Sequence, residues 1–71
     1  MPLIEIKMFK NELDKNQSAT LIQKVTDAVT EVTSEKLRAV TWVVIQEVND
    51  GHWGVGGQAL VLNDVKKMMN E

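Results

Sequence analysis

Apolar and polar side chains alternate along the first part of the chain, from Leu3 to Phe9. Ile4, Ile6 and Met8 fall on one face of this segment, while the other face carries charged residues among its apolar ones. A period of two is typical of a β-strand with one fully apolar face. The polar run that follows, Lys10 to Asp14, suits a turn and the N-cap of a helix.

The pattern then changes to the period of an α-helix. Apolar residues recur at spacings of one, three or four and form a single stripe, while four polar positions between them face water. The predicted helix ends in the stretch from Thr33 to Lys36. The stripe comprises Leu21, Ile22, Val25, Ala28, Val29 and Val32, and the polar positions are Gln23, Lys24, Asp27 and Glu31.

A second strand-like run extends from Leu37 to Val48, and both of its faces are largely apolar. Such a strand is covered on both faces. Because one helix covers only one face, we expect the other to contact a second subunit. Strand, helix and strand in this order predict a βαβ unit with parallel strands and a right-handed crossover. The predicted fold class is therefore α/β, or α+β in some schemes.

Turn-forming residues separate the remaining elements. Asn49 to Gly51 predicts a turn, and the glycine-rich stretch from His52 to Gly57 suits a tight hairpin or a loop that faces a ligand. Gln58 to Leu62 is predicted as a short strand. Asn63 or Asp64 is predicted to cap a short final helix.

Length and composition restrict the classes of protein. Residues 1–71 are predicted to form one domain, and domains of this size bury only about 60% of their unfolded surface. With no cysteine and one histidine, disulfides are excluded and a zinc site is not expected. Oligomerisation is then the expected source of further stability.

Other partners are not expected. No stretch approaches the roughly 20 apolar residues that span a membrane, and the start lacks the pattern of a signal peptide. We therefore predict a cytoplasmic protein that contacts no membrane. A formal charge of −2 without any basic run argues against nucleic acid as a partner. No cofactor or metal is predicted.

Pro2, the only proline, directly follows Met1. Removal of Met1 would convert the Pro2 nitrogen from an amide into a secondary amine, a base and nucleophile whose unperturbed pKa is ~8. An apolar pocket or a nearby cation would lower this pKa towards neutrality, where a general base works best. Taken alone, the proline also suits the first residue of a strand.

Three features occur in an order and spacing that resembles the 4-oxalocrotonate tautomerase family over nearly the whole chain. They are Pro2 after the methionine, Thr20-Leu21-Ile22 on the helix, and the loop Gly51-His52-Trp53-Gly54-Val55-Gly56-Gly57. The resemblance implies a cofactor-independent isomerase whose prolyl amine transfers protons in the keto–enol interconversion of small 2-oxo acids. It also implies a β-α-β protomer with a C-terminal hairpin and short helix, assembled as a homohexamer, a trimer of dimers.

The resemblance assigns roles to individual residues. Pro2 is expected to act as general base and acid, and Trp53 stands where the family usually has a phenylalanine that walls the pocket. Substrate carboxylates and a developing enolate need positive charge, and Arg38, the single arginine, is the expected source. Lys7 and Lys10 are further candidates for binding a carboxylate.

The cations are where the chain departs from the family pattern. Glu12 stands at or beside the place of one family arginine, and Thr41 or Trp42 stands near that of a second. The reversed charge at Glu12 argues against a dicarboxylate such as 2-hydroxymuconate and favours a monoacid or an uncharged carbonyl compound. Hydration, dehalogenation or decarboxylation by a cationic prolyl amine remains an alternative. With Met1 retained, the chain would be a non-catalytic assembly protomer.

Overall fold

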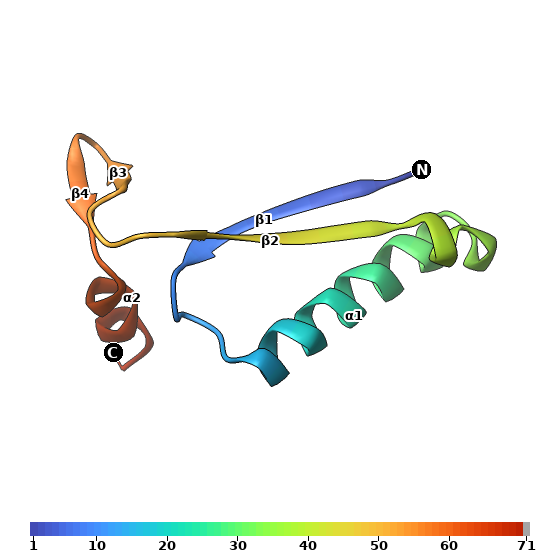
Figure 1. Cartoon of the computed structure of the whole chain (residues 1–71), viewed down its shortest axis with the longest axis horizontal. Coiled ribbons are helices and arrows are strands. Elements are labelled where there is room, and N and C mark those ends of the chain that lie inside the picture. Colours follow the sequence, from blue (N-terminus) through green and yellow to red (C-terminus); the bar gives the residue numbers. More distant parts are fainter. Residues whose placement is uncertain (71) are drawn as a thin grey trace.

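The computed structural model describes residues 1–70, which form strands and helices in the order shown in Figure 1. The elements are β1 (Leu3–Phe9), α1 (Lys15–Val32), the 3₁₀ helix η1 (Glu35–Val40), β2 (Trp42–Val48), β3 (Trp53–Val55), β4 (Gln58–Leu60) and α2 (Leu62–Met69).

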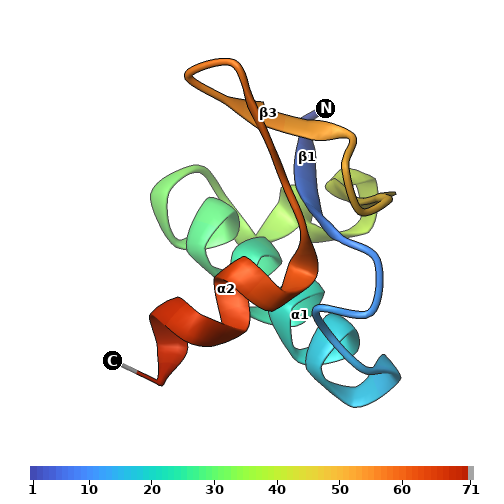
Figure 2. The same cartoon turned by 90° about the vertical axis from the view of Figure 1, so that its left-hand side faces the viewer.

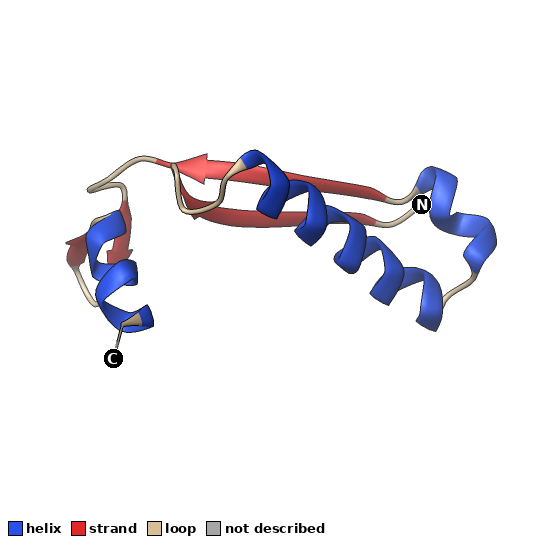
Figure 3. Ribbon diagram, turned by 90° about the horizontal axis from the view of Figure 1, so that it is seen from below, coloured by secondary structure: helices blue, strands red, loops and turns tan. Residues whose placement is uncertain are grey.

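The first strand, the long helix and the second strand form a βαβ unit. β1 and β2 pair in parallel, with Leu3 opposite Trp42 and Phe9 opposite Val48. α1 runs alongside this two-stranded sheet (Figure 3) and covers the face that carries the apolar set Ile4, Ile6 and Met8, which is half-buried. The alternation along β1 therefore predicted both the strand and the face that it buries, and the predicted fold class is confirmed.

The start of α1 is fixed by a reciprocal pair of hydrogen bonds. Asp14 is the N-cap, and its carboxylate accepts a hydrogen bond from the Gln17 amide at 2.7 Å. The Gln17 side chain in turn accepts from the Asp14 amide at 3.0 Å. This capping box satisfies two backbone donors that the first helical turn leaves without partners. The predicted turn and N-cap are confirmed.

The second strand begins later than predicted. Leu37 to Val40 belong to η1, and β2 begins only at Trp42. The Ser34 hydroxyl accepts a hydrogen bond from the Lys36 amide at 3.2 Å, which caps a helical turn where the apolar pattern suggested extended backbone. Arg38 therefore lies in a 3₁₀ helix and not in the strand.

The C-terminal part forms an antiparallel hairpin followed by a helix. β3 and β4 pair through Trp53 and Leu60, so the predicted hairpin is confirmed, although the second strand ends at Leu60 and not at Leu62. The helix also begins earlier than predicted, at Leu62. Asp64 lies inside its first turn and accepts a hydrogen bond from the Val61 amide at 2.9 Å, and the Asp50 carboxylate caps the Leu62 amide at 2.7 Å.

A single protomer has almost no core of its own. Among residues 1–70 only Phe9 and Thr30 are buried. The C-terminal arm, which we define as residues 53–70, projects beyond the end of the βαβ unit, and Figure 2 looks onto its outer side. The radius of gyration is 14.7 Å, whereas a compact domain of this length has about 11 Å. The protomer is thus an extended unit with much uncovered apolar surface.

Phe9 joins the arm to the βαβ unit. The centroids of its ring and the Trp53 ring lie 5.2 Å apart, and the two ring planes are inclined at 34°. Replacing Phe9 with alanine is expected to lower the free energy of unfolding by about 3–5 kcal/mol, since it removes a buried ring and leaves a cavity. Thermal denaturation measures this loss. Val55→Ala is the control, because Val55 is exposed in the same hairpin. A Phe9→Ala protein as stable as the control would contradict the proposed joint.

Candidate active site

Pro2 lies immediately before β1, where the ladder of the parallel sheet begins. Its carbonyl accepts a hydrogen bond from the Trp42 amide at 2.9 Å, so the backbone of Pro2 is anchored to β2. The nitrogen lies on the other side of the Cα atom, outside the ladder. Met1 is 84% exposed, and its removal therefore loses little contact. The hydrogen bond that anchors Pro2 to β2 therefore does not involve its nitrogen.

Arg38 is tied to the same end of the sheet by its main chain. The Thr41 amide donates to the Arg38 carbonyl at 3.2 Å, and the next amide along the chain, that of Trp42, donates to Pro2. Two consecutive amides thus connect η1 and the N-terminus. Both lie at the end of the βαβ unit opposite to the C-terminal arm (Figure 1).

The Arg38 guanidinium is held by two carboxylates. It lies 2.6 Å from a Glu35 oxygen and 2.8 Å from an Asp27 oxygen, and it also donates to the buried Thr30 hydroxyl at 3.2 Å. Hydrogen bonds from Arg38 lower the pKa of the Glu35 carboxyl, and the contacts with Glu35 and then Asp27 raise the pKa of the guanidinium. Because the pKa of Glu35 falls on folding, this contact stabilises the fold above the ordinary carboxyl pKa and is lost as the pH falls through the lowered value.

Asp27 was predicted to face water, but it is half-buried beside Arg38. The partner Glu35 is detectable in the sequence, since it precedes Arg38 by three residues and η1 places the two side chains on one face. The sequence gives no comparable signal for Asp27, whose contact depends on how η1 folds back against α1.

Trp53 lies at the opposite end of the protomer from Pro2. It is the first residue of β3 and packs with a tilted ring against Phe9, the last residue of β1, whereas Pro2 precedes the first residue of that strand. β1 is fully extended over its seven residues, so the two candidate site residues are a full strand length apart. Within one protomer the structure brings Arg38 and Pro2 to one end and leaves Trp53 at the other.

Two acidic side chains, one in the loop and one in β2, hold the loop after β1. Glu12 accepts a hydrogen bond from the Phe9 amide at 3.3 Å, and Glu47 of β2 accepts from the Asn11 amide at 3.2 Å. Asn11 has a positive φ of 67°, a conformation that asparagine tolerates better than most residues. Lys10 and the reversed charge at Glu12 therefore lie at the end of the sheet that carries Trp53.

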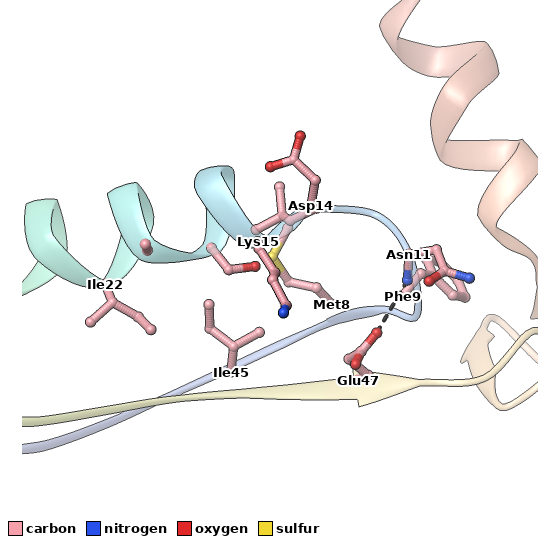
Figure 4. Close-up of a pocket in the computed structure, with 11 residues that line it drawn as sticks. Met8, Phe9, Asn11, Asp14, Lys15, Ile22, Ile45 and Glu47 are labelled. Carbon is pink, nitrogen blue, oxygen red and sulfur yellow. Dashed lines mark hydrogen bonds between the residues drawn. The ribbon is translucent and has the colours of Figure 1, made fainter.

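A pocket of about 640 Å³ opens between the first turns of α1 and this end of the sheet (Figure 4). Figure 4 shows Ile22 and Ile45 facing each other across it and the Glu47–Asn11 hydrogen bond at its rim. The sequence did not predict this pocket, because its walls come from separate elements. It is lined by Met8, Phe9, Asn11, Leu13, Asp14, Lys15, Ser18, Ala19, Ile22, Ile45 and Glu47.

Neither a metal-binding cluster nor a membrane-spanning helix is present in the part of the chain that the structure describes. No group of three or more acidic, histidine or cysteine side chains lies close enough together within residues 1–70 to hold a metal ion. None of the helices in this range has the length and apolar character needed to cross a membrane.

A family model described as "Tautomerase enzyme" matches residues 2–63, which is most of the chain. The chain belongs to this family. The match begins at Pro2 and includes both strands of the sheet, α1 and the hairpin with Trp53. The family resemblance inferred from the N-terminus and the glycine-rich loop is confirmed.

Individual relatives agree with this assignment to the tautomerase family. The chain is 37% identical over 57 residues to a Staphylococcus aureus (strain Mu50) protein named "Probable tautomerase", covering 80% of this chain and 90% of that protein. It is 35% identical over 60 residues to the 2-hydroxymuconate tautomerase of Bacillus subtilis (strain 168), covering 84% of this chain and 94% of that protein. A 4-oxalocrotonate tautomerase isozyme structure from Methylibium petroleiphilum superposes with a TM-score of 0.73 at 28% identity. The superposition covers 82% of this chain and 90% of that protein.

Proposed function

We propose that this tautomerase-family chain catalyses the keto–enol interconversion of a small 2-oxo acid or related carbonyl compound, with the Pro2 amine as general base and acid. The position of Pro2 is the observation that carries the proposal. Its carbonyl is bound by the Trp42 amide while its nitrogen is left outside the ladder. Removal of the exposed Met1 then yields a secondary amine at a fixed place.

The proposed reaction needs only one such base. In the ketonisation direction the neutral amine removes the hydroxyl proton of the enol, and the O–H electron pair forms the carbonyl. The electron pair of the C=C bond then takes the proton back from the ammonium at carbon. The amine ends neutral, and no electron enters or leaves the site. Arg38 donates hydrogen bonds to the oxygen on which charge develops.

Trp53 is proposed to wall the site, but it must come from a neighbouring chain. Pro2 and Trp53 lie at opposite ends of one protomer, so a pocket that contains both is assembled across subunits. An aromatic wall lowers the local dielectric, which favours the neutral form of the amine and so lowers its pKa.

Uncovered apolar surface supports assembly. On the sheet face away from α1, Leu3 is 57% exposed and Trp42, opposite to it, is 60% exposed. On the helix, Val32 is 86% exposed and helps to line an apolar groove of about 410 Å³. Soluble monomers rarely expose so much of their apolar residues in contiguous patches. The family resemblance favours a homohexamer, a trimer of dimers.

The proposal is tested with protein whose intact mass shows that Met1 is absent. Ketonisation of phenylenolpyruvate or 2-hydroxymuconate, followed by absorbance, is expected to rise with pH through the pKa of the prolyl amine, because a base must be deprotonated. A rate that falls through that pKa would instead favour acid chemistry by a cationic amine, as in hydration, dehalogenation or decarboxylation. Met1 retained at native expression levels, together with no activity, would favour a non-catalytic assembly protomer.

A further inference from the structure

One edge of the Arg38 guanidinium is fully occupied. Nε and Nη2 donate to the two Glu35 oxygens at 2.6 and 3.3 Å, and Nη2 also contacts Asp27 at 2.8 Å. Thr30 accepts from Nη2 as well, and its hydroxyl, which is buried, is fixed by the carbonyls of Thr26 and Asp27 at 3.1 and 3.0 Å. The plane of the guanidinium is therefore fixed.

The other edge is available to a ligand. Within residues 1–70 neither hydrogen on Nη1 of Arg38 has a hydrogen-bond acceptor, and the side chain is 42% exposed. The charge, in contrast, is already overcompensated, because two carboxylates surround one guanidinium. Arg38 thus offers two N–H donors without a net positive charge.

These two properties select between kinds of substrate. The carbonyl oxygen of a bound substrate is uncharged and needs only hydrogen-bond donors, which Nη1 supplies. A carboxylate gains most from an uncompensated charge, which Asp27 and Glu35 remove. We propose that Asp27 and Glu35 are specificity-determining residues that cancel the charge of Arg38, so that the site favours a carbonyl substrate lacking a carboxylate over its carboxylated counterpart. This inference rests on the proposed function, in which Arg38 contacts the substrate oxygen.

The substitutions Asp27→Asn and Glu35→Gln test this proposal. Each replaces a carboxylate with an amide of the same shape, which removes the charge and keeps an oxygen that accepts a hydrogen bond from Arg38. Phenylpyruvate and its methyl ester are the matched substrates, and exchange of their C3 protons for deuterium is followed by NMR. The double variant is expected to raise kcat/KM for the acid about tenfold, mainly through KM, because a charge-assisted hydrogen bond becomes available. The ester should gain less, and in kcat and not in KM, because it carries no charge until the enolate develops.

Three controls separate charge compensation from other effects. Glu31→Gln removes the same charge from the exposed side of α1 and should change neither substrate's kcat/KM. Arg38→Met in the double variant should abolish the gain for the acid. Glu35→Gln alone, which leaves Asp27 to hold Arg38, should give a smaller gain in the same direction and covers the case in which the double variant fails to fold.

The same measurements separate a failure of the charge-compensation proposal from a failure of the proposed function. An acid-to-ester ratio that stays at the wild-type value in folded single and double variants, with exchange still dependent on Pro2, would overturn the role of Asp27 and Glu35 alone. Exchange at the wild-type rate in a Pro2→Ala protein would overturn the proposed function. A gain for the acid that persists after Arg38→Met would also overturn the inference, because it would not act through Arg38.

Discussion

Insertion of a lysine between Met1 and Pro2 is expected to lower kcat/KM for ketonisation by about 10²- to 10⁴-fold, the contribution of a positioned general base. Methionine before a bulky residue is retained, so the Pro2 nitrogen stays an amide without a basic lone pair. The fold should be unchanged, since the Pro2 carbonyl still accepts from Trp42. Enzyme assays and intact mass are measured together.

Two further proteins make this result specific. A lysine added after the C-terminal residue changes the net charge equally and should leave the rate at the wild-type value. Pro2→Ala supplies a primary amine on a more flexible chain, so we expect a smaller loss than with the insertion, of about tenfold or more. Wild-type activity in either N-terminal variant would remove Pro2 from the mechanism.

Val32→Asp is expected to break up the assembly. Val32 is 86% exposed and is the last residue of α1, so an aspartate there would cost an isolated chain no more than about 1 kcal/mol, mainly from its unfavourable charge at the helix C-terminus. If the apolar groove of α1 is covered by a neighbour, the same aspartate places an unpaired charge in an interface and costs several kcal/mol. Light scattering should show a lower mass, and activity should fall with it.

Gln23→Asp is the matched control for this experiment. It adds the same charge at an exposed position of α1 outside the apolar groove and should leave the mass unchanged. A Val32→Asp protein with the wild-type mass would exclude this groove from the interface. A wild-type protein that is a stable, folded monomer would contradict the assembly altogether.

The bounds of β1 and the cap of α1 were predictable because each depends on residues close in sequence. Alternation from Leu3 to Phe9 gives the strand, and Asp14 with Gln17 forms the cap. The stretch from Leu37 to Val40 was not predictable in this way. Its apolar residues fit a strand, and the capping by Ser34 that makes it helical is a weaker signal than the apolar pattern.

The candidate site likewise contains residues that were predictable from the sequence and a contact that was not. Pro2 and Trp53 became candidates through a sequence motif, and Arg38 became one because it is the single arginine. Compensation of its charge by Asp27 depends on the packing of η1 against α1, which joins residues eleven positions apart through the intervening turn. Local periodicity assigned Asp27 to the solvent-facing side and contains no information about that contact.

The separation of Pro2 and Trp53 along the protomer has a genetic consequence. If each site takes its proline from one chain and its tryptophan from another, a chain defective in Pro2 still contributes an intact wall, and a chain defective in Trp53 still contributes an intact amine. Co-expression of the two inactive alleles would then produce mixed oligomers in which some sites are complete. Intragenic complementation would be a property of this locus, and a single defective allele would lower activity in the oligomers it enters without abolishing it.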